Sequence, residues 1–197
     1  MSFWKKLFDI KKKRTEPEAS SPYLKEKKNN LEVIFAEKFT LKGGKFIYSD
    51  NVQSTDKFFK LILEENNWKI QDLICFDPQL IQRFGLESTP DPFESQNFKA
   101  LLTGCENLIA NKGAILICHH QLKDFKLEKL PDFFIVYSGL DNFVSDVSEG
   151  MSQLKKKYFD QLPNNITTLN VRNSKNENDF LSYGKSAKNL YLILQDK

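Results

Sequence analysis

The chain has only two histidines, His119 and His120, and they directly follow Cys118. Imidazole and thiolate groups bind zinc and transfer protons, so this triplet has the chemistry of a metal site or an acid–base pair. It ends the apolar run AILIC, which is typical of a buried strand. Because adjacent side chains of a strand point to opposite faces, we expect the two rings to share no metal ion. Ordinary surface histidines are then expected, with an acid–base or ligand contact for one ring as the alternative.

A second group of polar residues lies in two turns at strand ends. One turn follows the segment LLTG and the other precedes the last apolar run. Ligands of open α/β sheets gather beyond the carboxyl ends of the strands, so we expect the two turns to form one cleft for a small anion. A glycine turn would offer backbone N–H groups and the lysines would offer charge. The candidate ligand-binding residues are Glu106, Asn107, Asn111, Lys112, Gly113, Tyr183, Lys185 and Ser186. Helix capping or turn formation is the structural alternative for each of them.

Other motifs of catalytic and nucleotide-binding proteins are missing from the sequence. The segment YGKSAK resembles the end of a P-loop, but Asp179 stands where the first glycine belongs and a strand pattern follows. Neither G-x-S-x-G nor G-x-G-x-x-G occurs. These observations leave the catalytic residues unknown.

The cysteines Cys75, Cys105 and Cys118 are odd in number and form no C-x-x-C pair. This pattern argues against a disulfide framework, a zinc knuckle and an iron–sulfur cluster held by this chain. We therefore expect no cofactor and no metal, and a reducing, cytoplasmic environment.

Positive charge is concentrated at the start of the chain. Residues 1–28 carry nine Lys or Arg and four acidic residues, whereas the other 169 residues sum to −2. A nucleic-acid-binding domain carries its excess charge on the folded part, so we expect no nucleic-acid partner. Residues 1–14 place aromatic residues and lysines at helical spacing. A loosely ordered tail is the expectation there, with docking on a partner or contact with an anionic membrane as alternatives. No apolar segment of signal-peptide or membrane-spanning type is evident.

The elements that must position these residues alternate along the chain. Strand patterns lie near 45–49, 70–76, 113–118, 133–138 and 189–194, separated by helical patterns. The clearest helical stripe runs over 140–162, with Ser138 or Asp141 as its cap, and CENLIAN is expected to form a short helical turn. Such alternation predicts an α/β fold, with a mainly parallel sheet and helices on both faces. We expect one domain over 29–197, preceded by a tail and linker over 1–28.

From about residue 30 to the end, the order of these signals resembles the LUD family of lactate-utilisation proteins. The family pattern is a strand, an A-E-T-G-T/S turn, an apolar strand, an L-P-x-x strand, a long helix and a G-x-H-G-P-like turn before a last strand. The matching segments are LIANKGAILIC, KLPDFFIVYSG, the helical pattern from Leu140, and YGKSAKNLYLILQD. Two departures concern polar positions, because Asn111 and Lys112 replace the Glu-Thr of the turn and Lys185 replaces the histidine.

The resemblance implies a fold like that of the sugar-isomerase and CoA-transferase superfamily. It also implies a role beside an iron–sulfur oxidoreductase that converts lactate to pyruvate. The chain would then be an accessory or small-ligand-binding subunit. The alternative is an enzyme that acts on a small carboxylate or phosphorylated metabolite, with Glu106, Lys112 and Lys185 at its site.

Overall fold

The computed structural model describes residues 31–87, 98–123, 125–159, 161–172 and 187–196. The helices are α2 (Leu31–Leu41), α3 (Val52–Glu65), α4 (Pro78–Phe84), α5 (His119–Leu122) and α6 (Val147–Lys157), and short 3-10 turns cover Ile70–Asp72, Leu127–Lys129 and Leu140–Asn142. The strands are β1 (Lys45–Ser49), β2 (Leu73–Cys75), β3 (Ala100–Thr103), β4 (Asn107–Ile109), β5 (Ala114–Ile117), β6 (Phe133–Gly139), β7 (Phe143–Val144), β8 (Thr167–Val171) and β9 (Ala187–Gln195).

The described strands join in a mostly parallel sheet with the order β2-β3-β6-β9-β8-β5-β4-β7, and β1 also pairs with β9. Every pairing among β1, β2, β3, β6 and β9 is parallel. The β5 strand runs antiparallel to β4 and β8, while β7 is parallel to β4. The expected mainly parallel α/β fold is therefore confirmed, and the five expected strands all belong to this sheet.

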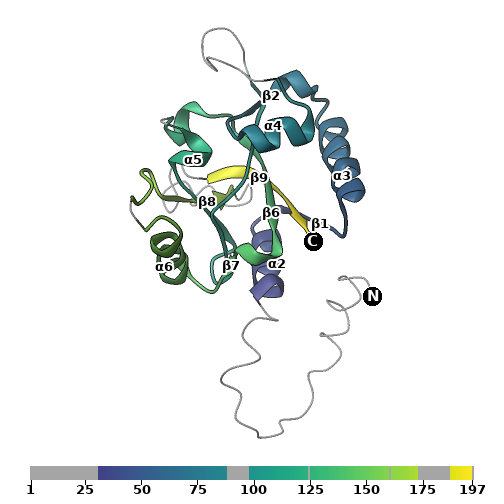
Figure 1. Ribbon diagram of the computed structural model, residues 1–197. Helices are drawn as coiled ribbons and strands as arrows, with labels where there is room; N and C mark the ends of the chain where they lie inside the picture. Colours follow the sequence, from purple (N-terminus) through teal and green to yellow (C-terminus); the bar gives the residue numbers. More distant parts are fainter. Residues whose placement is uncertain (1–30, 88–97, 124, 160, 173–186, 197) are drawn as a thin grey trace, which may run out of the picture.

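Helices cover both faces of the parallel strands (Figure 1). The β9 strand shows why, because its buried apolar side chains alternate between two cores. Leu190, Leu192 and Leu194 contribute to the core that contains α2, whereas Tyr191 and Ile193 contribute to the core that contains α3 and α4. An apolar strand that is buried on both faces is typical of a parallel sheet. The α6 helix forms a smaller core with β4, β5 and β7.

Local side chains and a glycine set several element boundaries. The side chain of Asn51 accepts a hydrogen bond from the backbone N–H of Ser54 and caps α3. Gly85 ends α4 in the left-handed conformation, with φ of 66°. Among the described residues, no helix has the length and apolar character needed to cross a membrane.

Two expected helical segments are wrong. CENLIAN contains strand β4 instead of a helical turn, because its apolar residues pair with both β5 and β7. The long helix begins at Val147 instead of Leu140, and Asp146 caps it in place of Ser138 or Asp141. The first part of the expected helix is a 3-10 turn followed by β7, whose Phe143 and Val144 pair with Leu108 and Ile109. Apolar spacing fits a helix there, but sheet pairing of buried residues determines the backbone.

Candidate functional site

A buried carboxylate, that of Glu106, lies just beyond the carboxyl end of β3. Its backbone N–H donates to the carbonyl of Leu116 in β5 at 2.8 Å, which fixes the chain between the parallel strands and β4. The side chain of Glu106 is only 1% exposed. The next parallel strand, β6, ends beside β3, and Asn142 follows it. The site therefore occupies the edge of the sheet where ligands of α/β proteins usually bind.

Donors from two other elements converge on the Glu106 carboxylate. Oε1 accepts hydrogen bonds from Gln121 Nε2 at 3.0 Å and Tyr158 Oη at 3.1 Å, and from the Cys118 thiol at 3.3 Å. Oε2 accepts from Lys157 Nζ at 2.8 Å. A buried carboxylate is tolerated when its oxygens are paired and hydrogen-bonded in this way. The network ties β3 to β5, α5 and the end of α6.

The charges of this network stabilise one another. Burial of Glu106 opposes its ionisation, but the hydrogen bonds from Lys157 and Gln121 outweigh burial and hold the pKa of the carboxyl below its usual value. Burial likewise disfavours the charged form of Lys157, but the bond to Glu106 raises the pKa of its amine. Burial raises the pKa of Tyr158. The site therefore holds a carboxylate and an ammonium group at neutral pH, with a protonated phenol beside them.

A small cleft of about 220 Å³ opens beside this ion pair, lined by Glu106, Asn107, Asn142, Gln153, Leu154 and Lys157. The amide nitrogen of Asn107 donates to Gln153 Oε1 at 2.8 Å, which orients the Gln153 side chain. Because the Gln153 oxygen accepts this bond, the amide nitrogen of Gln153 is the group left to act as donor toward a ligand. The cleft combines one ion pair with side-chain amides, so it can bind a small polar molecule.

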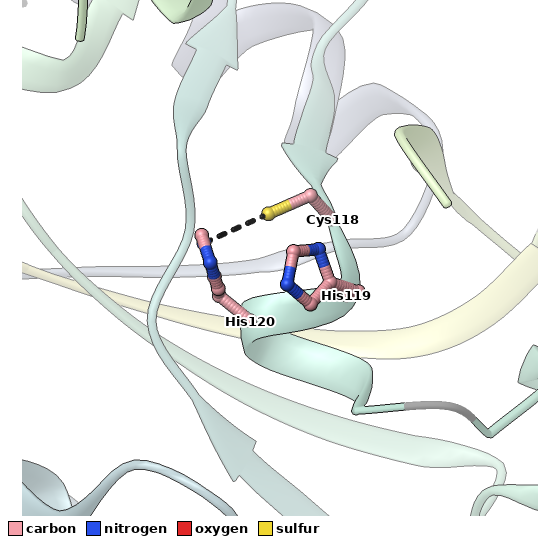
Figure 2. A group of neighbouring side chains, drawn as sticks. All are labelled: Cys118, His119 and His120. Carbon is pink, nitrogen blue, oxygen red and sulfur yellow. Dashed lines mark hydrogen bonds between the residues drawn. The ribbon is translucent and has the colours of Figure 1, made fainter. Parts of the chain in front are cut away.

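The two histidines do not point to opposite sides, which corrects the expectation from the sequence. The β5 strand ends at Ile117, and His119 begins the short helix α5 after an extended Cys118. The helical turn brings the two rings together, with centroids 4.0 Å apart. Figure 2 shows both rings beside the Cys118 thiol. The ligand atoms of these three residues lie within 4.8 Å of one another, which is a size that can hold a metal ion.

Each histidine of the pair has its own hydrogen-bonding role. His119 and Asn164 are bonded twice, since the backbone N–H of His119 donates to the Asn164 carbonyl and the Asn164 N–H donates to His119 Nδ1, both at 3.0 Å. His120 faces the buried network, with Nδ1 3.1 Å from Tyr158 Oη and 3.6 Å from Cys118 Sγ. Burial raises the pKa of the Cys118 thiol to about 12. His119 therefore anchors α5 and His120 extends the Glu106 network.

Three of the candidate residues form a turn that packs on α2. Lys38 donates to the Asn111 carbonyl and Lys42 to the Lys112 carbonyl, each at 2.6 Å. Gly113 has φ of 54°, and a Cβ atom there would lie 2.6 Å from the backbone nitrogen of Phe39. The close approach of this glycine therefore serves the packing of a helix.

The structure brings Glu106 and Asn107 into the cleft. Tyr183, Lys185 and Ser186 lie outside the described residues. That their turn forms one cleft with the turn over residues 106–113 therefore stays a prediction.

Sequence reasoning missed three other residues that line the cleft. Asn142 ends the 3-10 turn that precedes β7, and Gln153 and Lys157 belong to α6. Helical register offers a signal for one of them. The buried Leu154 and the half-buried Tyr158 mark the face of α6 that packs on the sheet, and Lys157 lies three residues after Leu154. Of the three consecutive lysines at this end of α6, Lys155 and Lys157 flank this face, and Lys156 points away from it. The register thus narrows the choice to two lysines without revealing a partner.

Comparison with solved structures places the fold among known proteins. The chain has the fold of a DUF162 family protein from Deinococcus radiodurans. The two structures superimpose with a TM-score of 0.60 at 16% sequence identity, covering 86% of this chain and 98% of the other. The DUF162 family is related to the LUD-domain proteins. No protein-family model matches the sequence, and no curated protein is a significant match.

Proposed function

We propose that this chain is an accessory, small-ligand-binding subunit of a lactate-utilisation-type system, and that it acts beside an iron–sulfur oxidoreductase. The observation that carries the proposal is the cleft between Glu106 and α6, at the carboxyl edge of the parallel strands. The likeness of the fold to a DUF162 protein and the resemblance of the sequence pattern to the LUD family support the same assignment. A cytoplasmic location belongs to this proposal.

The size and donors of the cleft suit a small carboxylate. A volume of about 220 Å³ is below the usual range for drug-sized ligands, so a molecule of a few heavy atoms fits best. Lys157 has three N–H donors and gives one to Glu106, so it can also bind a ligand carboxylate. The Gln153 amide can donate to the same carboxylate or to a hydroxyl or keto oxygen. Lactate and pyruvate have this arrangement of groups.

The experiment for this proposal is calorimetric titration of the full chain with lactate, with pyruvate and with inorganic phosphate. We expect binding of a small carboxylate that the Lys157→Met variant loses, because the replacement keeps a chain of similar length without the charge. Lys156→Met is the matched control, since Lys156 is exposed and does not line the cleft. Binding that is unchanged in Lys157→Met, or the absence of carboxylate binding by the wild type, would contradict the proposal.

The expected partner needs a separate test, because a small-ligand site can serve many systems. Affinity purification of the chain from its own cells should bring down a protein that contains iron and acid-labile sulfide. Elemental analysis measures the iron content of the copurified fraction, and a colorimetric assay measures its acid-labile sulfide. A fraction that contains no iron above the level of an untagged control would remove the partner from the proposal and leave the ligand site.

One observation favours the alternative of an enzyme acting on a small anionic metabolite. Glu106, which lines the cleft, is in contact through Tyr158 with His120, and all three groups can accept or donate a proton; Tyr158 Oη lies 3.1 Å from both partners. General acid–base catalysis uses such groups. Turnover of a small carboxylate or sugar phosphate, followed by NMR and abolished in Glu106→Gln, would establish this alternative.

A further inference from the structure

We propose that Glu106, Cys118 and His120 bind one divalent metal ion of the zinc type. The sequence predicted no metal, with the two histidines at the end of a strand, but the helical start at His119 brings His120 Nδ1 to 3.6 Å from Cys118 Sγ. The site uses Oε1 of the Glu106 carboxylate, whereas Lys157 bonds to Oε2 and lines the cleft. The metal proposal therefore does not depend on the ligand proposed for the cleft.

Two of the three distances among the donor atoms match a tetrahedral site, and the third, between Nδ1 and Oε1, is wider. Cys118 Sγ lies 3.6 Å from His120 Nδ1 and 3.3 Å from Glu106 Oε1, and Nδ1 and Oε1 are 4.0 Å apart. A zinc ion with bonds of about 2.3 Å to sulfur and about 2.0 Å to nitrogen and oxygen holds its ligand atoms roughly 3.3–3.6 Å apart. An ion can therefore enter this triangle when the His120 ring and the Glu106 carboxylate move closer by roughly half an ångström or slightly more.

The donor set matches the chemistry of zinc. One thiolate, one imidazole and one carboxylate are the three ligand types that zinc takes in proteins. The thiolate and the carboxylate would neutralise the two charges of the ion. The Cys118 thiol now donates to Glu106, so the ion must displace the thiol proton, which leaves to solvent as the S–metal bond forms. One proton is therefore released for each ion bound.

The surroundings provide access and support for this site. The His120 side chain is 43% exposed, so an ion can reach the triangle from solvent. Tyr158 Oη lies 3.1 Å from both His120 Nδ1 and Glu106 Oε1, so it borders this triangle. His119 belongs to the same compact group, but its Nδ1 accepts from the Asn164 N–H. Its role is to hold α5 so that His120 faces Cys118, as outer residues of metal sites commonly do.

Lys157 opposes the metal, and this opposition makes a sharp test. Its ammonium group bonds to the other oxygen of Glu106, and its side chain is 60% exposed. Removing this cation should strengthen metal binding while it weakens the binding of a small carboxylate. The Lys157→Met variant should therefore change the affinity for the metal ion and the affinity for a carboxylate in opposite directions. Either proposal can then fail without the other.

The experiment is titration of the full chain with Co²⁺ and with Zn²⁺. We expect one Co²⁺ per chain, with a thiolate-to-cobalt charge-transfer band in the near ultraviolet, and release of one proton per ion by calorimetry in buffers of different ionisation enthalpy. His120→Ala, which changes a partly exposed side chain, should weaken binding at least about tenfold. Cys118→Ser should lose the charge-transfer band, and Cys75→Ser, at a buried cysteine outside the triangle, should keep it.

Three results would overturn the proposal. The first is the absence of one-to-one binding by the wild type. The second is equal affinity of the wild type and His120→Ala for Zn²⁺. The third is a charge-transfer band that survives in Cys118→Ser. The His120→Ala comparison remains decisive if Cys118→Ser fails to fold.

Discussion

Lys157 Nζ lies 2.8 Å from Oε2 of Glu106, although the two residues are 51 positions apart in the chain. This ion pair links the last turn of α6 to the carboxyl end of β3. The carboxylate is almost fully buried and the lysine is mostly exposed. The two partners therefore differ in what their removal leaves behind, since loss of the carboxylate leaves a solvated cation and loss of the lysine leaves a buried anion.

Replacing Glu106 by glutamine should destabilise the fold by about 1–3 kcal/mol, because Tyr158, the Cys118 thiol and Lys157 lose a charged acceptor. Urea unfolding at neutral pH measures the change. Glu64→Gln, at an exposed position of α3, is the matched control and should stay within about 0.5 kcal/mol of the wild type. A loss for Glu106→Gln no larger than the control would show that the network adds nothing to stability.

The stability from Glu106 should also depend on pH. Its pKa is lowered from the ordinary value of 4.5 by the folded state, so its contribution is fully present above about 4.5 and is lost as pH falls through the folded-state pKa. The difference in unfolding free energy between the wild type and Glu106→Gln should therefore shrink in acid. Urea unfolding of both proteins over the acid range measures it. A difference in unfolding free energy that grows as pH falls would contradict the predicted direction of the pH dependence.

Sequence reasoning succeeded where a local signal coincides with the tertiary environment. The β9 strand is a continuous apolar run buried on both faces, α3 and α4 begin at side chains that cap them, and α4 ends at Gly85. It failed over 140–146, where apolar spacing fits a helix but Phe143 pairs with Leu108 of β4. Such a pairing depends on a partner 35 residues away, which periodicity does not report.

The candidate site shows the same division between local and distant information. Glu106 and Asn107 could be predicted from their place after a strand at the sheet edge. Lys157 could not, because its partner is set by how α6 packs on β4 and β5. The shared side of the two histidine rings depends on a single backbone change, from strand to helix at His119. A strand assumption extended by one residue therefore placed the two rings on opposite sides.

Gly113→Ala should be strongly destabilising, by about 3 kcal/mol or more. The residue has φ of 54°, and a new Cβ would lie 2.6 Å from the backbone nitrogen of Phe39 in α2. Gly85→Ala is the matched control, since φ is 66° there and no atom lies within 4 Å of a Cβ. The control should lose only about 1–2 kcal/mol. Thermal and urea unfolding measure both variants, and equal losses would mean that α2 does not pack tightly on this turn.

The cysteines should be unreactive in the native protein. Burial raises the pKa of Cys75 and of Cys105 to about 11 each, and that of Cys118 to about 12, so few thiolates exist at neutral pH. Alkylation with iodoacetamide should therefore be slow in buffer and complete in denaturant, as followed by mass spectrometry. Rapid labelling of Cys118 in the native state would contradict its burial.

The observed start of α6 leads to a last prediction. The side chain of Asp146 accepts a hydrogen bond from the Glu149 N–H at 2.9 Å, and its carboxylate lies at the positive end of the helix. Asp146→Ala should cost about 1 kcal/mol, because the N–H of Glu149 loses its acceptor at the first turn. Asp146→Asn should lose much less, since an amide oxygen can accept the same bond. Urea unfolding compares the two variants with the wild type. If the helix instead began at Leu140, residue 146 would lie within its second turn, and its side-chain oxygen would find no free backbone N–H to accept from. Asp146→Ala would then be neutral or stabilising, because alanine favours helix interiors.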